Sequence, residues 1–533
     1  MARTRGVSVE SQFTPQMDFD TPRDTVYSTP MMPPPQWTPV HPSLPHFWPF
    51  EVDIKTERQM FVNDIPTRKE STISTFSTSQ PPTPHDPLPS FLAECWVQHE
   101  HFESREESFA EEPLDFNFFN FPHEPSTPTH QTVIQVDECD QHLLDHFLEN
   151  VARLIFPILD INQHGSARSD VILPALESNK CYLHCCLSIS ALHLKATHHL
   201  EGEQIDNDIM RHRVATISEL CEAFKHDKDH SQILEATLGM ILFQSSVGSP
   251  DDGLPDIPWH EHFQAATSLV EKLELHEPLQ TDFAPQLHPS FNMTLASWID
   301  ILGATMLCRV PVFAHTYRHK AEMGITSGLA ELMGCEDRVM YLISEIACLE
   351  ALKLQGMDDL TLCTHITGLG EQLTNTEIGL ADVGDVYSIA THVMRPKQLS
   401  KNITAVFRLA ARIHLCSLVP DFDRHQTSIV ALVESLTSTM AFIPGGVDGF
   451  DRSLVWPLLV AGSVSLEGSS FRTMFSIRSK ELCRAADFGS FGRVAELLKD
   501  IWHTNAGFFA YEEKKSIHWR DVMRQKGRDF LLI

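Results

Sequence analysis

The stretch LLDHFLENVARLIFP, residues 143–157, decides the fold that we expect for most of this chain. Its apolar residues recur at spacings of three and four positions until Pro157 ends the run; they are Leu144, Phe147, Leu148, Val151, Leu154 and Ile155. This spacing matches the period of an α-helix, so the stretch predicts an amphipathic helix of about four turns. The apolar face of such a helix must be buried, and we expect it to pack against another helix.

Patterns of the same kind continue to the C-terminal end of the sequence. They predict helices over residues 182–200, 205–224, 233–243, 263–273, 295–310, 339–354, 406–418, 429–442 and 494–502. Segments rich in Pro, Gly and Asp, such as SPDDGLPDIP at 249–258, separate them. Strict alternation long enough for a sheet is absent from the sequence, as is a fixed repeat typical of a solenoid. The predicted fold class is all-α.

The composition changes near residue 135. The first 135 residues hold 20 of the 33 prolines but only one glycine, Gly6. Because proline fixes φ and favours extended conformations in the residue before it, this segment cannot be helical for long. We therefore predict two regions: a mostly disordered, Pro-rich arm over 1–135, called the acidic arm below, and a helical domain over 136–533.

The whole chain is acidic, with 41 Lys+Arg against 71 Asp+Glu, which gives 41 − 71 = −30. The arm contributes 8 − 19 = −11 and the remainder 33 − 52 = −19. Such a balance repels phosphate backbones, so we do not expect the chain alone to bind DNA sequence-specifically. The twelve scattered cysteines favour reduced thiols. No secretory signal and no apolar run of about 18 residues is present, so we expect a soluble intracellular protein without a membrane partner.

The acidic arm contains a segment that mixes carboxylates with large aromatic residues. It reads HFESREESFAEEPLDFNFFNF from His101 to Phe121. The carboxylates keep the rings solvated in the free state, so the segment is available to a groove on a partner and would order on binding. This composition is typical of an activation-type segment. The alternative is a strap that covers the folded part of the same chain.

Six Thr-Pro steps in the arm are candidate sites for a proline-directed kinase. They are Thr14, Thr21, Thr29, Thr38, Thr83 and Thr127. Each phosphate would add about −1.5 to −2 charges to a segment that is already acidic. The alternative is a Pro-rich tail without modification.

The sequence offers no catalytic motif, since CxxC, HExxH, GxxxxGK[ST] and GxSxG are all absent. The nearest candidate metal ligands are Cys181, Cys185 and Cys186, with His184, His193, His198 and His199 nearby. Cys181 and Cys185 would share one helical face, but a closed zinc shell usually takes ligands from two elements, whereas a buried cysteine packs as a small apolar residue. We expect core packing, nominate no catalytic, cofactor-binding or metal-binding residue, and do not expect an enzyme.

The acid-rich run DDGLPD at 251–256 resembles the metal-binding carboxylates of all-α terpene cyclases. In those enzymes a helix directs the carboxylates at magnesium ions. Gly253 and Pro255 break such a helix here, so we predict a turn.

Basic residues gather near the C-terminal end, at Lys514, Lys515, Arg520, Arg524, Lys526 and Arg528. One interpretation is a phosphate-binding stripe. However, Asp521 and Asp529 interrupt the cluster, while Trp519, Val522 and Met523 supply an apolar side. We therefore predict a helix whose tail, residues 530–533, docks on the core.

Five blocks together carry a family resemblance. They are FLENVARLIFPILDINQHG, LESNKCYLHCCLSISALHLKAT, LGMILFQSSVGSPDDGLPDIPWHEHFQAA, SLVWPLLVAGSVSLE and HWRDVMRQKGRDFLLI, in that order. Residues 137–533 thereby resemble the regulatory region of fungal-specific transcription factors, the group that includes the arginine-metabolism regulator. The resemblance implies a large all-helical regulatory domain, nuclear location and control of RNA polymerase II transcription.

Members of that family usually carry an N-terminal zinc cluster of six cysteines, in which CxxCx6C is repeated. This sequence departs from the pattern, because only Cys95 precedes Cys139. We nominate no DNA-binding residue and expect a regulator that works through protein contacts, either as a homodimer or with a DNA-binding partner factor. The alternative is a helical scaffold or adaptor protein without direct DNA binding.

Overall fold

A computed structural model describes residues 134–162, 168–198, 202–226, 229–248, 258–276, 289–376, 383–507 and 517–533. The predictions for the arm up to residue 133, including the segment 101–121 and the six Thr-Pro steps, lie outside these ranges, as does the acidic run 251–256. In the described part of the chain the elements are helical, apart from one isolated antiparallel bridge between Tyr387 and Met394. The all-α prediction is confirmed.

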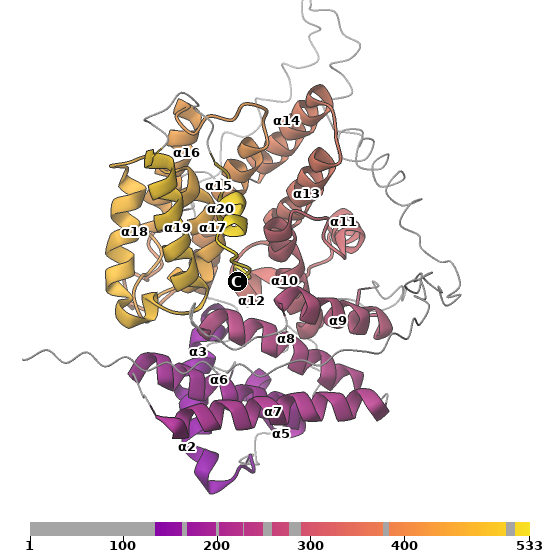
Figure 1. Cartoon of the computed structure of the whole chain (residues 1–533). Helices are drawn as coiled ribbons and strands as arrows, with labels where there is room; N and C mark the ends of the chain where they lie inside the picture. Colours follow the sequence, from indigo (N-terminus) through magenta and orange to yellow (C-terminus); the bar gives the residue numbers. More distant parts are fainter. Residues whose placement is uncertain are drawn as a thin grey trace, which may run out of the picture. The chain divides into compact units, whose positions relative to one another are not determined.

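The first group of helices contains a closely packed set in which α6 lies against both α7 and α8 (Figure 1). The predicted helix over 144–155 is present as α2, a π-helical turn and α3. The bounds are α2 Gln141–His146, π-turn Phe147–Val151, α3 Ala152–Ile155, α4 Pro157–Asn162, α5 Leu173–Ser178, α6 Lys180–His198, α7 Glu203–His226, α8 His230–Val247 and α9 Trp259–Lys272.

The remaining helices complete the described chain. Their bounds are α10 Phe291–Leu307, α11 Ala314–Met323, α12 Leu329–Met333, α13 Asp337–Leu354, α14 Asp359–Asn375, α15 Pro396–Ser417, α16 Thr427–Met440, α17 Val455–Val464, α18 Ser470–Glu481, α19 Gly489–Gly507 and α20 Trp519–Gln525. A short 3₁₀ turn, η7 Asp451–Leu454, leads into α17.

An aromatic stack joins three of these helices at the centre of the core. The Phe407 ring on α15 lies 5.5 Å from that of Trp298 on α10 and 5.9 Å from that of Trp456 on α17, centroid to centroid. All three side chains are fully or almost fully buried. Trp456 Nε1 donates to Thr305 Oγ1 at 2.9 Å, so the buried indole N–H is satisfied. The stack therefore anchors α10, α15 and α17 to one another.

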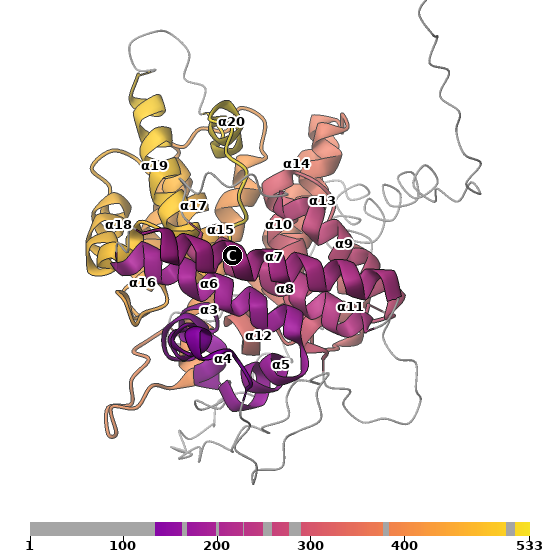
Figure 2. The same cartoon turned by 60° about the horizontal axis from the view of Figure 1, so that its bottom comes forward.

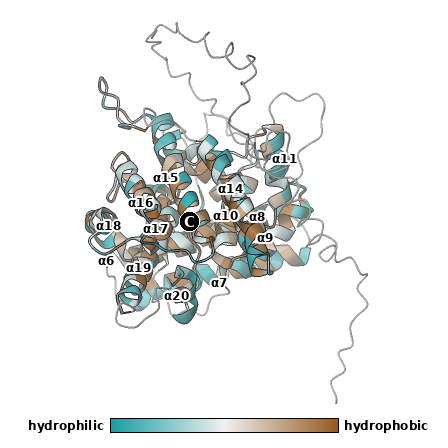
Figure 3. Ribbon diagram, turned by 90° about the horizontal axis from the view of Figure 1, so that it is seen from above, coloured by the Kyte–Doolittle hydropathy of each residue, from teal (hydrophilic) through white to brown (hydrophobic). Residues whose placement is uncertain are grey.

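Helices α10 and α17 are buried on every side, and both are coloured mainly as hydrophobic in Figure 3. A helix that is apolar all round has no periodic stripe, so α17 was visible in the sequence only as a short apolar run. Despite this hydrophobicity, no helix in the described ranges combines the length and the apolar character needed to cross a membrane.

Candidate functional site beneath the C-terminal segment

The C-terminal segment folds as the sequence predicts, with a helix followed by a docked tail. The helix α20 begins at its N-cap His518, whose ring nitrogen accepts a hydrogen bond from Arg520 N. The side chains of Trp519, Val522 and Met523 are buried, and so are all four residues of the tail, 530–533. The prediction of a helix whose tail packs on the core is confirmed.

The basic residues of this segment are bound by acids of the same chain. Arg528 lies 2.9 Å from Asp500, and Arg524 pairs with Asp521 at 3.6 Å. Lys526 lies 3.7 Å from Asp500. Their charges are therefore largely balanced locally, which argues against the alternative of a phosphate-binding stripe. Lys514 and Lys515 lie outside the described residues.

Arg520 differs from these residues because it is buried. Its Nη1 donates to Glu350 Oε1 on α13 at 2.6 Å, and its Nε donates to the Thr305 carbonyl oxygen on α10 at 2.7 Å. His414 on α15 lies 3.3 Å from the same carboxylate. The guanidinium thus ties the C-terminal segment to α10 and α13, and the Glu350 carboxylate links α15 to the same cluster through His414.

The environment of Glu350 keeps its carboxylate charged. Burial alone would raise its pKa, but nearby His414 and Arg520 outweigh the loss of solvent and hold the pKa of Glu350 well below its usual range. The pKa of His518 falls to about 3, chiefly because the ring is buried and also because Arg520 lies nearby. This cluster is therefore a fixed ion pair at neutral pH rather than a proton carrier.

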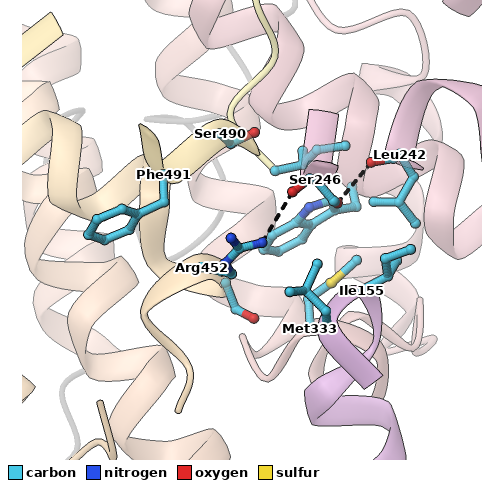
Figure 4. Close-up of a pocket in the computed structure, with 11 residues that line it drawn as sticks. Ile155, Leu242, Ser246, Met333, Arg452, Ser490 and Phe491 are labelled. Atoms are coloured by element: carbon cyan, nitrogen blue, oxygen red, sulfur yellow. Dashed lines mark hydrogen bonds between the residues drawn. The ribbon is translucent and has the colours of Figure 1, made fainter. Parts of the chain in front are cut away.

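Beside the tail lies a small cavity, of about 30 Å³, in which distant parts of the sequence meet. The close-up in Figure 4 shows several of the side chains that surround it. The lining residues are Leu154, Ile155, Leu242, Ser246, Trp298, Met333, Arg452, Ser453, Ser490, Phe491 and Ile533. Ser490 connects two of its walls, since its Oγ lies 2.9 Å from the Ser245 carbonyl oxygen and 3.0 Å from that of Leu531.

Arg452 is the charged residue of this cavity. Its Nη1 donates to the Ser246 carbonyl oxygen at 3.2 Å and its Nη2 to that of Ala485 at 2.6 Å, while the guanidinium lies 4.3 Å from the Phe488 ring centroid. Its Nε is buried without a hydrogen-bond partner among the described residues. Burial lowers the pKa of Arg452 to about 10. The side chain is therefore a buried cation held by backbone carbonyls.

Trp298 supplies a second buried donor at this cavity. It lines the same space, and its Nε1 has no hydrogen-bond partner among the described residues. Two N–H groups without acceptors favour an acceptor such as water or a small anion. A space of about 30 Å³ holds one or two water molecules. In this conformation the cavity cannot take an organic effector, so a larger ligand would require the tail to move.

The cysteines that the sequence raised as conceivable zinc ligands lie in the core. Cys181, Cys185 and Cys186 are buried in α6, and burial raises the pKa of Cys181 to about 12. The predicted core packing of the three thiols is confirmed. The neighbouring histidines pair with other rings: His184 Nδ1 lies 3.1 Å from His212 Nδ1, and His193 Nδ1 lies 2.8 Å from His146 Nε2.

Sequence reasoning did not find Arg452 or Glu350. Their partners lie far away in the sequence: Arg452 donates to the Ser246 carbonyl oxygen, 206 positions earlier, and Glu350 accepts from Arg520, 170 positions later. A periodic pattern cannot signal a contact of this kind. Ile533, in contrast, was expected to be buried, because the sequence predicts that the tail 530–533 docks on the core.

Comparisons with known proteins place the chain in context. A family model described as "Fungal specific transcription factor domain" matches residues 142–533. "Transcriptional regulatory protein pro1" of Neurospora crassa is 51% identical over 563 positions, which cover 100% of this chain and 79% of that protein. "Pestheic acid cluster transcriptional regulator 3" of Pestalotiopsis fici is 20% identical over 478 positions, 79% of this chain and 80% of that protein. No solved structure is significantly similar.

Proposed function

Because the chain belongs to the fungal-specific transcription factor family, we propose that it regulates RNA polymerase II genes from the nucleus through its helical domain and its acidic arm. The observation that carries the proposal is the family match over 142–533, supported by a relative with 51% identity that is named as a transcriptional regulator. The family and the relatives' names point to a regulator of transcription and not to an enzyme.

The two regions have different parts in this proposal. The helical domain supplies a stable body, in which buried ion pairs such as Arg520–Glu350 fix the relative positions of α10, α13 and α20. The acidic arm supplies contacts to coactivators or the transcription machinery through residues 101–121. The support for the second part is the composition of that segment, because carboxylates beside aromatic residues suit binding in an apolar groove with a basic rim.

Recruitment through protein contacts is the route to DNA that the charges favour. The chain carries −30, and the described basic residues of the C-terminal segment pair with acids of the same chain. A DNA-binding partner factor would then supply the base contacts. Control of a single metabolic or secondary-metabolism pathway is the finer proposal; its support is the name of the Pestalotiopsis fici relative, which ties that protein to the pestheic acid cluster.

We expect the acidic arm to activate a reporter when residues 1–135 are fused to an unrelated DNA-binding domain. Replacing Phe116, Phe118, Phe119 and Phe121 together by serine should lower reporter output by at least about tenfold, because aromatic anchors usually carry most of the energy of such contacts. The measurement is reporter transcript per molecule of fusion protein.

A matched control replaces four other phenylalanines of the same arm by serine, namely Phe13, Phe19, Phe47 and Phe50. This variant should keep most of the output, since these rings lie outside the segment 101–121. Equal loss in both variants, or no activation by the arm at all, would contradict the role given to residues 101–121.

The alternative function, a scaffold or adaptor without a transcriptional role, makes a different prediction about location. A tagged chain that stays outside the nucleus under all growth conditions would favour the scaffold. A nuclear chain that changes reporter output would exclude it.

A further inference from the structure

Arg424, in the loop before α16, is a buried arginine without a partner. Its side chain is only 8% exposed. Its Nη1 is buried without a hydrogen-bond partner among the described residues, and no carboxylate of that part of the chain forms an ion pair with it. Because a guanidinium is costly to bury without an acceptor, the position of Arg424 requires an explanation.

The other buried arginines of the described chain each have an acceptor. Three of them pair with carboxylates and the fourth donates to a backbone carbonyl oxygen; the pairs are Arg318–Glu345, Arg478–Asp451, Arg520–Glu350 and Arg408–Thr376. Arg424 is therefore the exception among residues of the same type and the same burial. This contrast indicates that its acceptor comes from outside the described chain.

A second arginine with an unused donor lies near Arg424. Arg472 belongs to the first turn of α18, and its Nε is also buried without a hydrogen-bond partner in the described ranges. Its Nη2 donates to the Ser465 carbonyl oxygen at 3.0 Å, and its guanidinium lies 4.5 Å from the Trp502 ring centroid. Burial lowers the pKa of Arg472, and the neighbouring charge of Arg424 lowers it further. Two guanidinium groups thus lie near each other.

The N-terminus of α18 adds donors of its own. The N-cap Ser469 makes no side-chain capping bond, and its Oγ is buried without a partner among the described residues. The first N–H groups of a helix have no partner within the helix, and they form the positive end of its dipole. A Cβ at Gly468 would meet no atom within 4 Å, so there is room beside this turn. Figures 1 and 2 show α18 next to α16, which follows Arg424 in the chain.

The nearest carboxylates do not supply the missing acceptor. Asp423 precedes Arg424 in the sequence, but its Oδ1 accepts a hydrogen bond from His425 N at 2.9 Å. Glu467 is exposed and acts to raise the pKa of Arg472. Both residues belong to the described part of the chain, yet Glu467 and Arg472 form no ion pair there. The two guanidinium groups therefore keep donors that are available to a ligand.

We propose that Arg424, Arg472 and the N-terminus of α18 form a binding site for a phosphoryl group. The paired N–H donors of a guanidinium match the oxygen atoms of a phosphate, and a helix N-terminus suits the same group. A dianion would also balance both arginine charges, which water or chloride would not. The group has two sources to be distinguished, a phosphorylated metabolite and a phosphothreonine of the acidic arm. The inference assigns a ligand site and goes beyond the function proposed above.

The test is isothermal titration calorimetry of the purified full chain with inorganic phosphate, in chloride buffers of constant ionic strength. We expect a dissociation constant on the order of 0.1–1 mM. At about 20 mM, phosphate should then raise the thermal unfolding midpoint by about 2–4 °C over chloride. Arg424→Gln should weaken phosphate binding at least about tenfold and abolish the rise, since it removes one of the two charges. Arg472→Gln should weaken binding to a similar extent.

The matched control is Arg408→Gln, because Arg408 is 7% exposed and thus equally buried, but is already bound to Thr376. This variant should unfold at a lower temperature and bind phosphate as the native chain does. Without phosphate, Arg424→Gln should not lower the midpoint, because it removes a buried charge that has no acceptor. A native chain that binds no phosphate at about 20 mM, far above the expected dissociation constant, would overturn the proposal. Equal binding by the native chain and both site variants would do the same.

The source of the phosphoryl group is tested with two phosphate esters. One is a peptide of residues 79–87, SQPPTPHDP, phosphorylated at Thr83, and the other is glycerol phosphate. The ester that binds at least about tenfold more tightly than inorganic phosphate, and loses this advantage in Arg424→Gln, identifies the source. The unphosphorylated peptide is the control and should not bind. Binding of inorganic phosphate without binding of either ester would overturn the proposal, because the site would then accept a free ion only.

Discussion

Replacing Arg520 with methionine is expected to lower the free energy of unfolding by about 3–5 kcal/mol, because the variant leaves Glu350 as a buried charge without its main partner. The loss should be this large because Arg520 also satisfies the Thr305 carbonyl oxygen, so two core groups lose a donor at once. Urea unfolding followed by circular dichroism measures the difference. The control is Arg524→Met, whose side chain is 72% exposed and which should change stability by no more than about 0.5 kcal/mol.

The difference in unfolding free energy between the native chain and Arg520→Met should depend on pH, because it rests on the charge of the Glu350 carboxylate. In the native chain the pKa of Glu350 is lowered, so the charged carboxylate stabilises the folded state at pH values above the ordinary glutamate pKa. This contribution is lost as the pH falls toward the pKa that Glu350 has in the folded chain. In the Arg520→Met variant, protonation of Glu350 relieves a buried charge that has lost its guanidinium partner. The gap in stability between the two proteins should therefore narrow as the pH is lowered from neutral. A gap that stays constant with pH, or a loss no larger than that of Arg524→Met, would contradict the ion-pair account.

Replacing Gly489 with alanine is expected to cost about 2–4 kcal/mol, since strain and overpacking act together at this position. The backbone at Gly489 has φ +65°, and a Cβ there would lie 2.1 Å from the Ser246 carbonyl oxygen. That oxygen accepts a hydrogen bond from Arg452, so the clash should also disturb the cavity beside the tail. Thermal unfolding of the full chain is the measurement.

Gly468 provides the matched control for this substitution. It also has a positive φ, +72°, but no heavy atom lies within 4 Å of the position that a Cβ would take. Gly468→Ala should therefore cost only the conformational strain, about 1 kcal/mol. Equal effects at the two glycines would show that the close approach of α19 to α8 is not what constrains Gly489.

The sequence was most informative where a helix has one apolar face. All ten helices expected from periodicity are present, and the C-terminal tail docks as its apolar residues indicated. Helix α14, with its four threonines and two glycines, was missed because residues of low helix propensity obscured a weak period. Helix α17 was missed as a helix because it is apolar all round.

The surface and the cavity were harder to predict than the core. Residues 205–224 were assigned a single apolar stripe, but the structure shows that α7 also leaves apolar side chains such as Val214 and Ile217 exposed. The cavity collects residues from position 154 to position 533, and no local pattern relates them. Family membership, by contrast, was readable from five ordered blocks and is confirmed by the match over 142–533.

Control of transcription by this chain can be measured by nascent transcript sequencing after rapid induced degradation of the tagged protein. Synthesis of a defined set of transcripts should change as soon as the chain disappears, before growth is affected, and re-expression of a degradation-resistant chain should restore it. Nascent transcription identical to that of an untagged strain, despite complete loss of the protein, would show that the chain is not a transcriptional regulator.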